Sequence, residues 1–178
     1  DENIRGRLSR VLQGQLERSS SSNSYDYGIL TNSKTGKEFK IYKNVDGTLF
    51  HDTFEIIQKY LPKGDCVDVH GIKSNEWSAG YEDCKCYLTG NGMAGFAITP
   101  SGDLISVFNL GEQGFLRSIK GLVREEGAIT LDCYDSQRQH LPEMYERTLG
   151  FKTASILEFN YDILKEDRGK GYADYFVN

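Results

Sequence analysis

Two glycines between an apolar strand and an amphipathic helix mark the place where this sequence could bind an anion. Leu104 to Phe108 is predicted to form the strand, and Gly111 and Gly114 follow in the turn. Glycine permits positive φ and close backbone approach, and the N–H groups of Leu110 to Phe115 would point outward at the start of a helix. Glu112 would repel an anion there, and a turn that uses glycine only for its geometry is the alternative.

Other side chains that could transfer protons or bind metal are scattered along the chain. A general base for a protonated amine could be Asp132, Glu82, Asp83 or His70, which the sequence does not rank, and His51 and His140 have no obvious partner. The spacing in Cys84-Lys-Cys86 is tighter than that of zinc ligands, so no metal site is expected. Cys133 is expected to be a small buried residue in a reduced, cytoplasmic protein.

Strands and helices predicted from periodicity and turn residues must position these groups. Strands are expected at Tyr27–Thr31, Glu38–Lys43, Cys66–His70, Lys85–Leu88, Gly95–Thr99, Ala128–Tyr134, Ala154–Phe159 and Tyr172–Val177. Helices are expected around Phe50–Leu61, from Phe115 to a stop at Gly127, and at Leu141–Leu149 before Gly150, with a loop at Gly71–Asp83. The strand-helix-strand order places Leu104–Phe108 parallel to Ala128–Tyr134. We therefore expect an α+β fold, a mixed central sheet with flanking helices.

The N-terminal residues are predicted to form a helix and a linker. Apolar residues lie on one stripe of the helix, at Ile4, Leu8, Val11, Leu12 and Leu16. Ser19 to Ser24 has no apolar side chain to bury and is expected to be a linker. We expect residues 1–24 to precede a folded domain of residues 25–178, with the helix packed on this domain or in contact with another domain or subunit. Because the first residue is Asp, we also expect a processed chain or a piece of a longer polypeptide.

Composition limits the classes of function. A chain of 178 residues is one domain of ordinary size. The net charge of −5 opposes nonspecific nucleic-acid binding, which needs clustered Lys and Arg. No run of 18 apolar residues exists, so no membrane span is expected.

The segment LPEMYERTLGFK, with the strand ending LDCYD and the glycine turn before it, resembles the GNAT family of N-acetyltransferases. In that family a Tyr-bearing helix ending in Gly-Phe leads into the next strand, as Tyr145, Gly150 and Phe151 do here. The resemblance extends over Met93 to Phe176, roughly half of the chain. It implies a GNAT-like acyltransferase fold with acetyl-coenzyme A as the acyl donor.

The resemblance also implies roles for the matched residues. Tyr145 would be the catalytic acid that protonates the departing coenzyme A thiolate, because a phenol stays protonated at neutral pH; the alternative is a helix residue that packs on the sheet. Coenzyme A would bind at Phe108, Asn109, Leu110, Gly111, Gln113, Gly114 and Phe115. A backbone donor at Phe108 or Asn109 would polarise the thioester carbonyl. Asp135 would contact the acyl-carrying arm, or cap the following turn.

We therefore expect an acyl-coenzyme A-dependent N-acetyltransferase in which a small-molecule or protein amine attacks the thioester directly. The turn lacks an Arg or Gln followed by closely spaced glycines. That favours the alternative, a catalytically degenerate GNAT-like binding or assembly module of a larger phage or bacterial polypeptide. An effector or toxin module is a further alternative, for which the sequence has no chemical signature.

Overall fold

The computed structural model describes residues 2–32, 34–58, 81–133, 140–158, 160–170 and 173–174. Five strands form one antiparallel sheet in chain order: β1 (Tyr27–Thr31), β2 (Glu38–Lys43), β3 (Lys85–Thr89), β4 (Ala94–Ile98) and β5 (Leu104–Asn109). The helices are α1 (Glu2–Asn23), α2 (Gly47–Gln58), α3 (Phe115–Ser118), α4 (Lys120–Glu125), α5 (Leu141–Leu149) and α6 (Tyr161–Arg168). The expectation of an α+β fold with helices flanking a sheet is confirmed at this level.

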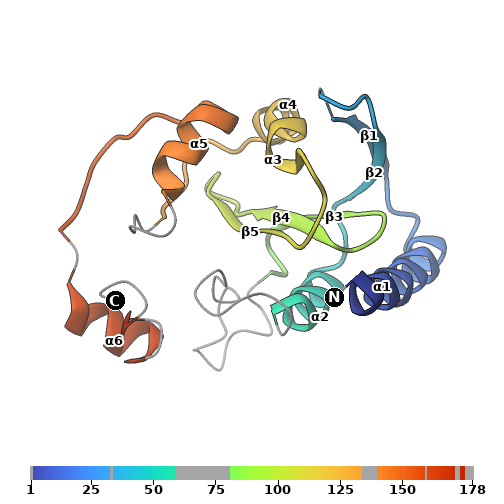
Figure 1. The fold of residues 1–178 in the computed structure, drawn as a ribbon, viewed down its shortest axis with the longest axis horizontal. Coiled ribbons are helices and arrows are strands. Elements are labelled where there is room, and N and C mark those ends of the chain that lie inside the picture. The colour runs from blue at the N-terminus through green and yellow to red at the C-terminus, as the bar shows by residue number, and fades with distance from the viewer. Residues whose placement is uncertain are drawn as a thin grey trace.

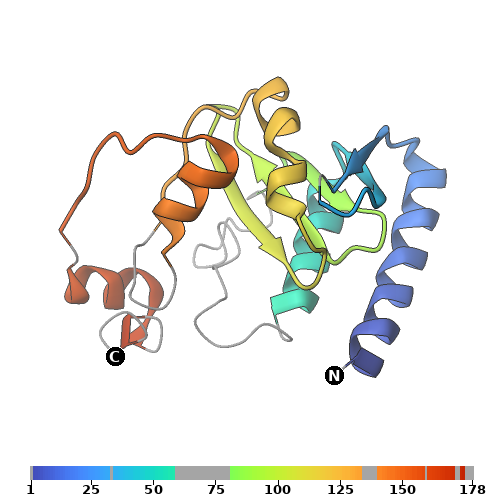
Figure 2. The ribbon, with the colours of Figure 1, turned by 45° about the horizontal axis from the view of Figure 1, so that its top comes forward.

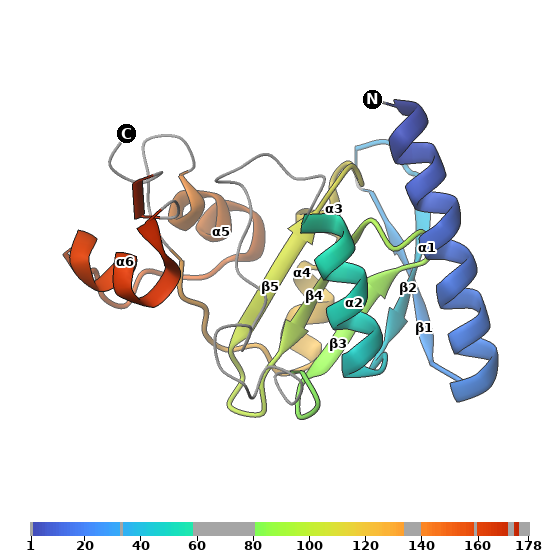
Figure 3. The same cartoon turned by 90° about the horizontal axis from the view of Figure 1, so that it is seen from below.

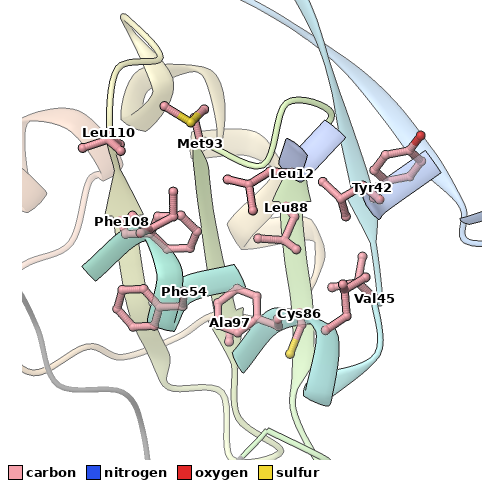
Figure 4. Packing of buried hydrophobic residues seen from close by; sticks show 14 of the residues in the cluster. Leu12, Tyr42, Val45, Phe54, Cys86, Leu88, Met93, Ala97, Phe108 and Leu110 are labelled. Atoms are coloured by element: carbon pink, nitrogen blue, oxygen red, sulfur yellow. The ribbon is translucent and has the colours of Figure 1, made fainter. Parts of the chain in front are cut away.

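Helices cover both faces of the sheet (Figures 1 and 3). α1 and α2 lie on one face, and α3, α4 and α5 lie toward the other. Because side chains alternate between the two faces of a strand, the sheet contributes to two separate cores. The α1–α2 core contains Phe50, Phe54, Leu88, Phe108 and Leu110 among others (Figure 4). The α3–α5 core contains Tyr87, Phe96, Phe115, Ile119 and Leu149 among others.

The serine run lies in α1, so the expected linker at Ser19 to Ser24 is wrong as secondary structure. The hydroxyls of Ser21 and Ser22 donate to the carbonyls of Glu17 and Arg18 one turn earlier. Serine is only a moderately poor helix former, and such bonds let it continue a helix that packing already holds. The helix ends where Ser24 takes a positive φ of 54°.

α1 is part of the core. Leu8, Leu12 and Leu16 are buried in the α1–α2 core, at 8%, 1% and 1% exposure. Leu12 packs on the β3–β4 turn, where a Cβ added to Gly92 would lie 2.6 Å from the Leu12 Cβ. The sequence left two alternatives for this helix, packing on the domain that follows or contact with another domain or subunit. The structure shows it packed on the domain that follows.

The expected parallel partner of β5 is present at a single point. Asp103 and Thr130 form an isolated parallel bridge, and the Leu104 N–H donates to the Thr130 carbonyl over 2.8 Å. The direction of the crossover is therefore as predicted, but the predicted strand is wrong for 128–133, whose described residues form only this bridge. β5 has a bulge directly after this bridge, and a bulge bends its strand.

The C-terminal strands are corrected too. The described residues 154–158 have no regular secondary structure and are exposed, with Ile156 and Leu157 at 87% and 88%. They lead away from the sheet to α6 (Figure 2). Asn160 caps α6 through its side chain, which accepts a hydrogen bond from the Ile163 N–H. The predicted strand at 66–70, most of the predicted loop at 71–83 and most of the predicted strand at 172–177 lie outside the described residues.

Several predicted elements are confirmed. The hairpin strands β1 and β2 have the predicted bounds, β5 begins at Leu104, and α5 has the predicted bounds and ends at Gly150, whose φ is 79°. Among the helices that the structure describes, none has the length and apolar character needed to cross a bilayer.

Candidate functional site

In the turn between β5 and α3, the predicted anion site, the side chain of Asn109 binds backbone N–H groups that an anion would need. The Asn109 side-chain oxygen accepts from the N–H groups of Gly111, over 3.0 Å, and Glu112, over 2.7 Å. The N–H of Leu110 donates to the Met93 carbonyl, and that of Phe115 donates to the Glu112 carbonyl. Four of the backbone donors proposed for the anion are thus bonded within the protein, and α3 has only four residues. The plain connecting turn, which the sequence left open, fits this geometry better.

Glu112 is directed inward. It is 5% exposed, and its carboxylate accepts from the Asn91 amide over 3.2 Å and pairs with Lys37 over 3.4 Å. These contacts join the turn to the β3–β4 turn and to β1–β2. The Glu112 carboxylate therefore connects three turns of the sheet and does not lie at the outer surface of its own turn.

The other predicted coenzyme A residues are divided between the interior and the surface. Phe108, Leu110 and Phe115 are buried, and the Phe108 ring stacks on Phe54 with centroids 4.9 Å apart. Gln113 and Gly111 are exposed. At Gly114, whose φ is 71°, an added Cβ would lie 2.5 Å from the Asn32 amide, which donates to the Gln113 carbonyl. Asp135 lies outside the described residues.

The second feature is the outer edge of β5, the side that does not pair with β4. After the bridge at Thr130, residues 131–133 form no further pair with β5 in the part of the chain that the structure describes. On its other side, β5 pairs with β4 with one extra residue, because Gly95 faces Phe108 and Ala97 faces Ile105. Such a bulge bends the strand and increases its twist. Among the described residues, the outer edge of β5 beyond Ile105 thus has no parallel partner.

The pairing decides which N–H groups face the outer edge of β5. Phe108 pairs with Gly95, and the Leu110 N–H donates to Met93 on the same side. Because successive N–H groups of a regular strand point to opposite sides, that of Asn109 points away from β4. Of the two predicted carbonyl donors, Asn109 has the suitable direction, and the N–H of Phe108 faces β4.

The bulge is held by two side chains that the sequence analysis did not single out. Ser106 is the extra residue and has a positive φ of 51°. Its hydroxyl is 2.6 Å from that of Tyr81, which is 1% exposed. No pattern in the sequence marks this contact, because the two residues are 25 positions apart and meet only in the folded chain.

Tyr145, the predicted catalytic acid, packs against the α3–α5 core. Burial, and secondarily the negative charge that Cys133 would carry, raise the pKa of Tyr145 to about 12. Cys133 belongs to residues 131–133, which follow the bridge at Thr130. The phenol is protonated at neutral pH, as a catalytic acid requires. The packing of Tyr145 against the core fits the alternative equally well, in which Tyr145 is a helix residue that packs on the sheet.

Three of the four candidate general bases, Asp132, Glu82 and Asp83, are described by the structure and are exposed. His70 lies outside the described residues. His51 is buried on α2, with its Nδ1 3.1 Å from the Asp52 carboxylate and 3.9 Å from that of Glu55. The ligand atoms of these three side chains lie within 4.8 Å of one another, a geometry that the sequence analysis did not anticipate.

One open hollow of about 410 Å³ lies at the N-terminal end of α2. It is lined by Asn44, Val45, Asp46, Gly47, Thr48, Glu82 and Cys84, and contains none of the predicted coenzyme A residues. The Asp46 carboxylate accepts from the N–H groups of Thr48 and Leu49 and so caps α2. We assign the acidic lining to helix capping.

Comparison with protein-family models, with curated proteins and with solved structures finds no match to this chain in any of the three.

Proposed function

We propose that the chain is an acyl-coenzyme A-dependent N-acetyltransferase of the GNAT type. The observation that supports this best is the outer edge of β5, with which a parallel neighbour pairs at Thr130 and, among the described residues, not beyond it. A thioester arm could pair with this edge as an added strand does. In the proposal, the outward N–H group of Asn109 contacts the arm from β5 and Tyr145 contacts it from α5.

In this mechanism a neutral amine attacks the thioester carbonyl, and the outward N–H group of Asn109 stabilises the developing oxyanion. The carbon–sulfur bond then breaks, the thiolate leaves, and the nitrogen of the new amide releases its extra proton to water. A phenol with a pKa of about 12 is a weaker acid than a thiol with an ordinary pKa of about 8.5. Full proton transfer to sulfur is then uphill by about 5 kcal/mol. We therefore propose that Tyr145 donates a hydrogen bond to the departing sulfur, which takes its proton from water after release.

The experiment is a thermal-shift titration with acetyl-coenzyme A and with S-acetylpantetheine, which lacks the nucleotide. Ligand at 100 times its dissociation constant adds about 2.7 kcal/mol, which for a domain of this size raises Tm by about 5–10 °C. We expect both compounds to raise Tm, because the edge of β5 would contact only the pantetheine arm. Tyr145→Phe should keep the shift and lower acetyl transfer. No shift with either compound would reject the proposal.

A matched variant separates the arm from the phosphates. Gln113 is exposed in the turn, so Gln113→Glu adds a charge without disturbing packing. If the phosphates of coenzyme A lie near the turn, this charge should weaken acetyl-coenzyme A binding by about fivefold. S-acetylpantetheine should bind the variant and the wild type equally.

The second candidate is a degenerate module of the same fold that binds no acetyl-coenzyme A. The closed turn supports it, because Asn109 occupies the donors that phosphate would need. It is the surviving candidate if neither compound shifts Tm.

A further inference from the structure

The segment that follows α5 has the sequence pattern of a strand, and its described part has no regular secondary structure. Residues 154–158 are all exposed, and the side chains of Ile156 and Leu157 are 87% and 88% exposed. Neighbouring residues of a strand point to opposite faces, so Ile156 and Leu157 would place one apolar side chain on each face of a sheet. This C-terminal segment (residues 154–158) would therefore bury apolar surface if it found a strand to pair with.

β1 has an edge that can accept a further strand. It lies at one end of the sheet and pairs with β2 alone among the described strands. The Lys43 N–H donates to the Asp26 carbonyl over 2.8 Å, so this pair is hydrogen-bonded. Hydrogen-bonded pairs alternate along an antiparallel ladder, and the pairing is regular from Tyr27 to Thr31. The backbone groups of Tyr27, Ile29 and Thr31 therefore point away from β2.

The side chains on this edge are apolar and exposed, at 59% for Tyr27 and 54% for Ile29. Edge strands usually carry Lys, Pro or a bulge that discourages pairing with another chain, and β1 has none of these. At its end the edge is contacted by α3, because the Ser118 hydroxyl donates to the Thr31 carbonyl over 3.4 Å. The stretch left for a partner is therefore centred on Tyr27 and Ile29.

The position of the C-terminal segment favours a second copy over the same chain. Figures 1 and 3 show α6, to which the segment leads, at the end of the molecule opposite to β1. The helix before the segment is held in place, because Leu149 of α5 is 1% exposed in the α3–α5 core. The other edge strand, β5, is buried or half-buried from Leu104 to Phe108, so a strand added there would cover less exposed apolar surface.

We propose that residues 154–158 of one copy add as a strand to the outer edge of β1 in a second copy. β1 has five residues, and the C-terminal segment matches it in length. Main-chain hydrogen bonds to Tyr27 and Ile29 provide affinity, and Ile156 and Leu157 cover apolar side chains on the two faces of β1. The contact is head to tail, so each copy keeps one unused surface. This inference goes beyond the proposed function and does not depend on it.

Sedimentation equilibrium gives the first test. One chain has a mass of 20.1 kDa, and the apparent mass of the wild type should rise above this value with concentration. Ile29→Glu puts a charge on the edge, across from Lys40, and Leu157→Glu puts one on the C-terminal segment. Each should raise the dissociation constant at least about tenfold, as the loss of a central contact does. Val11→Glu is the matched control, since Val11 is 61% exposed on α1, and it should associate as the wild type does.

Mixing the two variants gives the sharper test. Ile29→Glu keeps a wild-type C-terminal segment and Leu157→Glu keeps a wild-type β1, so the mixture contains the parts of one intact contact. Each variant alone should stay near the mass of one chain, and the mixture should reach about twice that mass. Replacing either variant in the mixture by the double variant should abolish the association. Urea unfolding should show both variants as stable as the wild type, because both positions are exposed.

Three results would overturn the proposal. The first is a wild-type protein that stays monomeric up to about 1 mM. The second is association that either variant fails to weaken, and the third is a mixture that stays monomeric although the wild type associates. None of them affects the proposed function, because the binding of acetyl-coenzyme A is measured separately.

Discussion

The burial of Leu12 makes α1 testable as part of the core. Leu12 is 1% exposed and contacts the β3–β4 turn at Gly92. Leu12→Ala removes its outer carbons and leaves a cavity at this contact. Buried leucines cost about 3–5 kcal/mol on such truncation, and we take the low end, about 3 kcal/mol, because a helix on the outside of the sheet can move inward. For a chain of this length that lowers Tm by about 6–12 °C.

The assay is urea unfolding followed by circular dichroism, with thermal unfolding beside it. A fall in the midpoint with an unchanged slope would show lost stability and no change in the surface exposed. Val11→Ala is the control, since Val11 is on the same helix at 61% exposure and should change stability by less than about 0.5 kcal/mol. If Leu12→Ala unfolds like the wild type, α1 is a detachable appendage and our account of the core is wrong.

Two further predictions concern ionisable groups. Because the pKa of Tyr145 is raised, the unfolded state loses the phenol proton near pH 10 and the folded state near pH 12. The free energy of unfolding therefore falls by about 2–3 kcal/mol between these pH values. Tyr145→Phe should reduce this loss of stability, measured by urea unfolding at a series of pH values. Glu112→Gln should change the free energy of unfolding little, because glutamine can still accept from Asn91 and the lost ion-pair partner, Lys37, is 68% exposed. Glu112→Ala should lower it by about 1–3 kcal/mol, because the Asn91 amide loses that acceptor. The reverse order for the two Glu112 variants in urea unfolding would contradict the inward carboxylate.

Local pattern determined the elements whose causes lie within a few residues. The hairpin of β1 and β2 follows from alternating side chains around a polar turn, and its pairing runs from Tyr27 with Tyr42 to Thr31 with Glu38. α5 follows from its apolar spacing and from Gly150, which takes the left-handed conformation that ends a helix. The turn at Gly111 and Gly114 was also located from the sequence. The hydrogen bonds that the Asn109 side chain makes within this turn were not predicted, because the side chain could equally have pointed to solvent.

Tertiary contacts decided the rest. Ser19 to Asn23 is helical because Leu8, Leu12 and Leu16 hold α1 against the sheet, a stabilisation that composition does not record. Residues 131–133 had a strand pattern but form no pair with β5 beyond the Thr130 bridge in the part of the chain that the structure describes. The bulge at Ser106 is accompanied by a contact between the hydroxyls of Tyr81 and Ser106, which are 25 residues apart in sequence. Sequence thus determined where the backbone could form helix or strand, and the tertiary structure decided where a strand found a neighbour, because that depends on packing between distant segments.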